Sequence, residues 1–258
     1  MNPSHRETGT ASFAPSFSPL PRRRGRIAYR RADETLPWGF EDWDMTLGRD
    51  GMRTLSAHCE MAVAGEDVVR DSVVSVHADF HPAEAYVRIM NKGELTGSGW
   101  FRFTDTEATC ESYSRDLGRV SQSIAIERPM RGFGLHAVQS DGWLAATFPF
   151  EKGPGHIEFK GRNLMHSLHH LGATGPSLCT TTSGFEFLGV EEVSVPAGTF
   201  TCNRVALRGI VNDHPPYDMW LSRDGDGLYV KGEAQGYLAS VFELVELEGG
   251  PLGTPAAA

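Results

Sequence analysis

The feature that most constrains the fold is a long alternation of apolar and polar residues between positions 52 and 127. A period of two residues is typical of β-strands that bury one face and expose the other. Turn residues such as Gly, Asn and Asp interrupt the alternation at short intervals. The pattern therefore predicts antiparallel strands joined by tight turns, at residues 52–63, 67–79, 84–92, 95–104, 107–114 and 118–127.

A different pattern occupies residues 131–148. After two glycines, the spacing of His136, Ser140 and Trp143 favours one face of a helix over residues 136–148. A helix that interrupts an antiparallel meander usually covers or plugs an opening. We therefore expect this segment to act as a lid. A second short helix is expected at residues 163–171, where three leucines fall on one helical face.

Further strand patterns follow this helical region and continue almost to the C-terminus, at residues 178–194, 199–211, 217–223, 227–232 and 236–247. The total of about ten or eleven antiparallel strands predicts a mainly β fold, a closed or half-open barrel with one or two helical inserts. The Ser-, Pro- and Arg-rich residues 1–25 are expected to be a disordered tail, followed by a single domain at 26–248 and a flexible tail at 249–258. The basic run Arg22–Arg26 is interpreted as a solvated linker.

Two groups of motifs resemble known bacterial families. The P-A-G-T-F hairpin at residues 196–200, the W-x-S-x-D segment at 220–224 and the following V-K strand are similar to families of unknown function. These look like calycin-type (lipocalin-like) or lipoprotein-carrier half-barrels. The motifs S-G-W-F-R-F, F-G-L-H and D-G-W resemble uncharacterised proteins of bacteria that degrade aromatic compounds and steroids. The resemblance concerns turn and packing residues, so it implies a fold and assigns no catalytic residue.

Charge and missing motifs narrow the possible functions. The formal net charge of −9 argues against nucleic acid or an anionic membrane as a partner. No run approaches the roughly 18 apolar residues of a membrane helix, and no apolar signal segment is present near the N-terminus. The four cysteines form no C-x-x-C pair and are interpreted as free thiols of a cytoplasmic protein. Without a P-loop, a G-x-G-x-x-G or a G-x-S-x-G motif, we expect no cofactor. A homodimer is compatible with these features.

The polar face of the first strands is the main candidate surface. It combines aromatic residues with Arg, Glu and His, and lysine is absent from it; its members are His58, Glu60, Tyr86, Arg88, Trp100, Arg102, Glu111 and Tyr113. One interpretation is a solvated sheet face with cross-strand ion pairs. The other is a concave face that binds an organic ligand beneath the helical lid, because flat apolar rings with polar tips suit such ligands.

Several histidines remain open to two interpretations. His136, close to the start of the predicted helix, could serve as a general base or simply bond a loop carbonyl. His166 and His170 would lie one helical turn apart, but no nearby carboxylate completes a metal site. A solvent-facing helix edge is the alternative, and we predict no metal.

The sequence therefore predicts a cofactor-independent acid–base enzyme, a lyase, hydratase or isomerase, acting on a hydrophobic aromatic or polycyclic small molecule. His136 or His58 would be the base, Tyr113 or Glu111 the acid, and Arg88 or Arg102 would stabilise an oxyanion. The substrate-binding candidates also include Tyr86, Trp100, Asp141, Trp143 and Trp220. A non-catalytic carrier of lipocalin type and a structural barrel are the alternatives.

Overall fold

The computed structural model describes residues 19–126, 130–158, 163–181, 183–208, 216–236 and 239–253. The strands of the N-terminal half are β1 (Arg22–Arg31), β2 (Pro37–Leu47), β3 (Arg53–Val63), β4 (Glu66–Val76), β5 (Pro82–Asn91), β6 (Glu94–Phe103), β7 (Glu107–Ser114), β8 (Gly118–Ala125) and β9 (Gly132–Gly134). The helix α1 (Val138–Ala146) and the short 3-10 helix η1 (Phe150–Lys152) follow. The remaining strands are β10 (Gly155–Glu158), β11 (Asn163–Met165), β12 (Cys179–Thr181), β13 (Gly184–Val195), β14 (Gly198–Arg208), β15 (Tyr217–Ser222), β16 (Tyr229–Ala234) and β17 (Ser240–Glu248).

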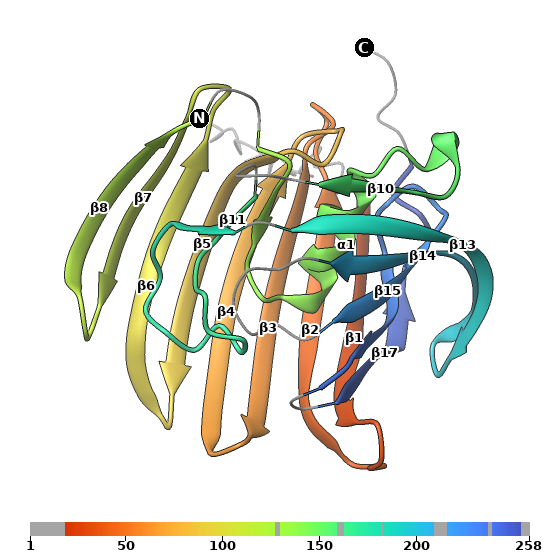
Figure 1. Ribbon diagram of the computed structural model, residues 1–258, viewed down its shortest axis with the longest axis horizontal. Coiled ribbons are helices and arrows are strands. Elements are labelled where there is room, and N and C mark those ends of the chain that lie inside the picture. The colour runs from red at the N-terminus through yellow and green to blue at the C-terminus, as the bar shows by residue number, and fades with distance from the viewer. Residues whose placement is uncertain are drawn as a thin grey trace, which may run out of the picture.

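Fourteen of these strands form one sheet in the order β10-β13-β14-β15-β16-β17-β1-β2-β3-β4-β5-β6-β7-β8. All of its strand pairs are antiparallel. The sheet curves around α1, with β1 to β4 and β13 to β17 on different sides of the helix (Figure 1). A small sheet, β12-β11-β9, completes the described part of the chain. The mainly β, antiparallel prediction is confirmed, whereas a closed barrel of about ten strands is not, because β8 and β10 do not pair with each other among the described residues.

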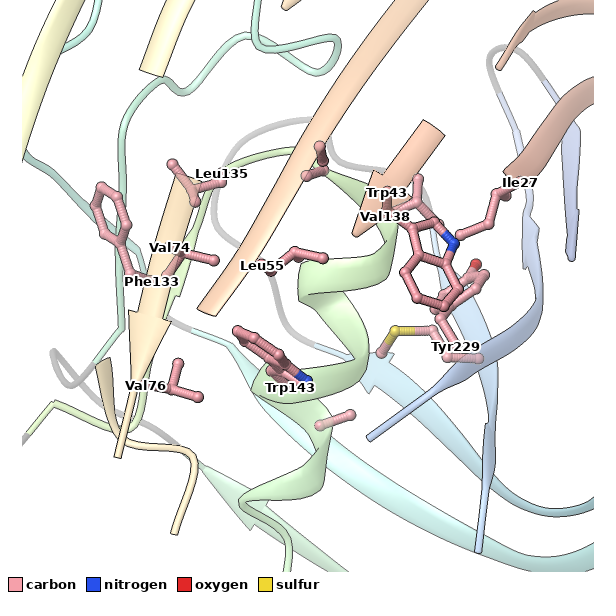
Figure 2. Packing of buried hydrophobic residues seen from close by; sticks show 14 of the residues in the cluster. Ile27, Trp43, Leu55, Val74, Val76, Phe133, Leu135, Val138, Trp143 and Tyr229 are labelled. Carbon is pink, nitrogen blue, oxygen red and sulfur yellow. The ribbon is translucent and has the colours of Figure 1, made fainter. Parts of the chain in front are cut away.

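The period-two pattern determines which face of the sheet is buried. In β3 and β4, the residues that alternate with the polar positions are buried, and they face α1. Trp143 of the helix packs beside Leu55 and Val74, as Figure 2 shows. Burying a ring of this size contributes roughly 2–3 kcal/mol to stability. The helix therefore fills the concave, apolar side of the sheet and forms part of the protein core.

The predicted helix at 136–148 is confirmed, whereas the second helix at 163–171 is wrong. Residues 163–165 form β11, which pairs with β9 on one side and β12 on the other. Backbone pairing on both edges outweighs the helical spacing of the three leucines, of which only Leu168 is strongly exposed. No helix among the described residues is long and apolar enough to cross a membrane.

The chain ends differ from the sequence prediction. The domain begins at β1 rather than after residue 25, and the strands β1 and β2 were not predicted. The basic run is not a linker, because Arg23 is buried and pairs with Asp224 (2.6 Å) and Asp226 (3.1 Å). At the other end Leu252 is buried and its N–H donates to Asp226, so the flexible tail does not begin at residue 249.

Replacing Arg23 with Ala tests this correction. The substitution leaves the buried carboxylate of Asp226 and the half-buried one of Asp224 without their cation, and we expect the free energy of unfolding to fall by about 3 kcal/mol. The matched control is Arg24→Ala, which removes an exposed pair with Glu248 and should cost less than about 1 kcal/mol. Urea denaturation of the two variants measures the difference, and equal stabilities would restore the linker interpretation.

Candidate functional site

The first turn of α1 is held by a carboxylate from the sheet. Glu41, on the buried face of β2, accepts hydrogen bonds from the backbone N–H groups of Val138 (2.6 Å) and Gln139 (2.8 Å). It also accepts from the hydroxyl of Tyr29 (2.7 Å) and the thiol of Cys59 (3.1 Å). The N-terminus of a helix presents unpaired N–H groups and a partial positive charge, so a carboxylate there stabilises the helix. Glu41 thereby fixes the position of α1 against the sheet.

Arg70, on the buried face of β4, holds two further segments, the residue His136 before α1 and the loop around Leu171. Its guanidinium donates to the carbonyl of Leu171 (2.8 Å), to the carbonyl of His136 and to the sulfur of Cys59 (3.5 Å). His136, whose carbonyl accepts from Arg70, has a positive φ of 57°, an uncommon backbone conformation for a residue with a side chain. Arg70 therefore carries a positive charge into the interior while it orders the start of the helix.

A cavity of about 100 Å³ lies between this network and the sheet. Its apolar wall is formed by Tyr29, Trp38 and Phe242, whose rings pack together with centroids 5.1–6.2 Å apart. Its polar end contains Arg70, His136, Asp141 and Tyr217. Its lining, apolar with a few converging polar groups, is typical of small-molecule sites, but its volume is below the roughly 300–1,000 Å³ usual for them.

A second cavity of about 60 Å³ shares three lining residues with the first. His136, Asp141 and Tyr217 line both cavities. The rest of the second cavity is formed by β9, α1, β11 and the strands near them, through Gly134, Leu144, Asn163, Leu164, Met165, Thr181, Ser183 and Leu207. The three shared side chains therefore contribute to the walls of two adjoining cavities.

Asp141 is the most unusual of the shared residues. It extends from α1 into both cavities and is half-buried, and burial raises the pKa of its carboxyl to about 7. The nearby carboxylate of Glu41 raises this pKa further, and Arg70 opposes the rise. Tyr217 donates a hydrogen bond to Asp141 (3.4 Å) and lies 2.6 Å from the hydroxyl of Tyr229. Because burial also raises the pKa of both phenols, they stay protonated and serve as donors.

The raised pKa of Asp141 predicts a pH-dependent stability. An Asp whose pKa rises from about 3.9 in the unfolded chain to about 7 in the folded protein contributes stability below pH 4 that is lost as the pH rises to 7. We therefore expect the stability difference between Asp141→Asn and the wild type to grow in favour of the variant as the pH rises from 4 to 7, by about 2–4 kcal/mol in total. Above pH 7 the difference should stay constant. Urea denaturation at pH 4, 5.5, 7 and 8.5 gives this difference. A difference that does not change with pH would contradict the raised pKa.

The histidines pack together without forming a metal site. The ring of His136 contacts that of His166 edge to face (5.1 Å), and its Nε2 donates to the carbonyl of Ser167 (3.0 Å). His166 is completely buried, and burial lowers its pKa to about 3, so it is neutral. His170 stacks on His169 rather than lying one helical turn from His166. Among the described residues no group of three His, Cys, Asp or Glu side chains could hold a metal ion.

Most residues singled out from the sequence lie on the opposite face of the sheet. The expectation that the helix covers the polar face is wrong, because an apolar helix packs against the apolar face. The residues left on the outer face are His58, Tyr86, Arg88, Trp100, Arg102, Glu111 and Tyr113. There His58 and Arg88 pair with Asp71 (2.7 and 3.3 Å), the cross-strand pairing of a solvated face. His58 and Tyr86 border a depression on this face, whose lining includes two arginines and three aspartates.

The two remaining tryptophans contact neither cavity. Trp143 is buried in the core, and its indole N–H donates to the carbonyl of Asp226 (2.9 Å). Trp220 lies between Arg204 and Lys231, whose cations approach its ring at 4.9 and 5.2 Å. Of the residues predicted from the sequence, His136 and Asp141 line the two cavities. Tyr86, Trp100 and Glu111 are neighbours in the strand register, but on the outer face.

The residues that complete the site were not predicted from the sequence; they are Tyr29, Trp38, Glu41, Arg70, Tyr217 and Phe242. For Arg70 a signal was present. In the strand that contains it, Arg70 shares its parity with Val68, Val74 and Val76, so an arginine stands where the pattern requires a buried residue. A charged residue at a buried strand position needs partners in the interior. Glu41 lay in a segment to which no strand had been assigned.

Comparisons with known proteins show the fold alone. No family model and no curated protein matches the chain. A β-barrel-like protein of the domain of unknown function DUF1849 from Brucella abortus is similar in structure, with a TM-score of 0.53 and 11% sequence identity. The match covers 89% of this chain and 98% of that one. A DUF1089 family protein from Pseudomonas aeruginosa matches at a TM-score of 0.42 and 11% identity, over 80% of this chain and 94% of that one.

Proposed function

We propose that the protein is a cofactor-independent acid–base enzyme, an isomerase, lyase or hydratase, that acts on a small hydrophobic molecule in the first cavity. The observation that carries this proposal is the position of Asp141. A carboxyl with a pKa near 7, bordering two cavities, can both accept and release a proton at neutral pH. The aromatic wall of the first cavity supports an aromatic or alicyclic substrate, in keeping with the calycin-type half-barrel that the sequence resembles.

The first cavity also has donors for a developing negative charge. The indole N–H of Trp38 and the Nε of Arg70 are buried and have no hydrogen-bond partner among the described residues, and both side chains line this cavity. A substrate carbonyl placed there would meet a cation and an N–H donor. Asp141 would remove a proton from the carbon next to the carbonyl, the electron pair would move to the oxygen, and Arg70 would stabilise the enolate. Return of the proton to carbon completes the cycle without a cofactor.

Hydrogen exchange on a ketone tests this chemistry directly. We expect the protein to catalyse incorporation of deuterium beside the carbonyl of 4-phenylcyclohexanone in D2O, followed by proton NMR. The catalysed rate should rise with pH through about 7, as Asp141 loses its proton. The control is the same protein heated until it unfolds. If no exchange above this control is seen with 4-phenylcyclohexanone or its 4-hydroxyphenyl analogue, the proposal is wrong.

A non-catalytic binding protein is the second candidate. Tyr29, Trp38 and Phe242 pack closely around the cavity, and an apolar wall of this kind suits retention of a ligand as well as its conversion. Binding of the ketone without any exchange would favour this function. We place either activity in the cytoplasm, on the basis of cysteines that are all free thiols.

A further inference from the structure

The second cavity contains two buried polar atoms that lack a partner. Asn163 and Thr181 line this cavity, and 2% and 5% of their surfaces are exposed. The side-chain oxygen of Asn163 and the hydroxyl of Thr181 make no hydrogen bond in the described part of the chain. Leaving such a group unpaired in the interior destabilises the fold. A ligand atom in this cavity would relieve that cost.

The small sheet places these two atoms together. Asn163 of β11 lies opposite Thr181 of β12 in the strand register, so their side chains lie on one face of the sheet. The amide nitrogen of Asn163 donates to the hydroxyl of Ser183 (2.9 Å), which fixes the amide with its oxygen left over as an acceptor. The acceptor of Asn163 and the hydroxyl of Thr181 therefore form a pair that suits a ligand hydroxyl, since a hydroxyl both donates and accepts.

The unpaired groups of the two cavities differ. Among the described residues, unpaired donors belong to Trp38 and Arg70 of the first cavity, whereas an unpaired acceptor of Asn163 and the unpaired hydroxyl of Thr181 belong to the second, and Asp141 lines both. We infer that the substrate is a hydroxy ketone that spans both cavities, with its carbonyl beside Trp38 and Arg70 and its hydroxyl held by Asn163 and Thr181. This inference rests on the proposed function, because it takes Asp141 as the group at which the substrate reacts.

Binding of two matched ketones tests the hydroxyl subsite. Calorimetry would compare 4-(4-hydroxyphenyl)cyclohexanone with 4-phenylcyclohexanone, which lacks only the hydroxyl. For the wild type we expect the hydroxylated ketone to bind about tenfold more tightly, the effect of one buried hydrogen bond. In Thr181→Val this preference should fall to about twofold or less. The control variant is Thr54→Val, which changes a residue on the outer face of β3 in the large sheet. In this variant the preference should be unchanged.

A loss of the preference in Thr181→Val would not be caused by misfolding of the variant. Thr181→Val removes an unpaired buried hydroxyl and keeps the side-chain volume, so its melting temperature should equal or exceed that of the wild type. Equal affinities for the two ketones, or no binding of either, would overturn the inference. The result is separable from the exchange experiment. If the protein prefers the hydroxylated ketone but catalyses no hydrogen exchange, the proposed enzyme activity is wrong and the hydroxyl subsite stands. If it catalyses exchange but binds both ketones equally, only the hydroxyl subsite is wrong.

Discussion

Asp141→Asn is expected to slow ketone hydrogen exchange by about 10²–10⁴-fold, the usual contribution of a positioned general base. The amide keeps the size of the carboxyl and can still accept from the hydroxyl of Tyr217. It cannot take up a proton from carbon, so the chemical step is lost. Affinity for 4-phenylcyclohexanone should change little, because the apolar wall is intact, and calorimetry verifies this.

The matched control for Asp141→Asn is Glu111→Gln. It makes the same carboxyl-to-amide change on the outer face of β7, where Glu111 accepts from Ser121. We expect full exchange activity in this variant. An Asp141→Asn protein that exchanges at the wild-type rate would show that Asp141 is not the base.

Replacing Glu41 with Ala is expected to produce the largest loss of stability, about 4 kcal/mol. Four donors lose their acceptor at once: the hydroxyl of Tyr29, the thiol of Cys59 and the two N–H groups that begin α1. All four are buried, so water does not replace the carboxylate at low cost. Urea denaturation measures the loss.

Two further variants make the Glu41 result specific. Glu41→Gln should lose about half as much stability, because one of its two oxygens becomes a donor that faces an N–H group. Asp42→Ala removes the neighbouring carboxylate, whose pair with Arg26 is exposed, and should cost less than about 1 kcal/mol. Equal effects of the substitutions at 41 and 42 would contradict the role of Glu41 in fixing the helix.

The strands between residues 52 and 127 could be predicted because their apolar residues recur at every second position and turns separate them. The strands β1 and β2 could not be recognised in the same way. In β1 the arginines occupy both faces, so the buried Arg23 resembles its exposed neighbours. Its burial depends on Asp224 and Asp226, about 200 residues further along the chain. No local pattern carries that information.

The candidate site could be predicted only in part for a related reason. His136 and Asp141 stood out because they interrupt the strand pattern, and both line the cavities. The side of the sheet that receives the helix was predicted incorrectly. The aromatic residues of the polar face favoured the outer surface of the sheet, whereas the apolar residues of the helix itself required the other side. The partners Glu41 and Arg70 become visible only when the strands are aligned.

The central claim is that ligands bind inside the sheet, beside Asp141, and not on its outer face. Indole N–H signals in a nitrogen–proton NMR spectrum distinguish the two places, because Trp38 lines the first cavity and Trp100 is exposed on the outer face. The five tryptophans give five signals, which single substitutions by Phe assign. On titration with 4-(4-hydroxyphenyl)cyclohexanone, we expect the signal of Trp38 to shift and saturate while that of Trp100 stays in place. A saturable shift of Trp100 with Trp38 unmoved would contradict the account.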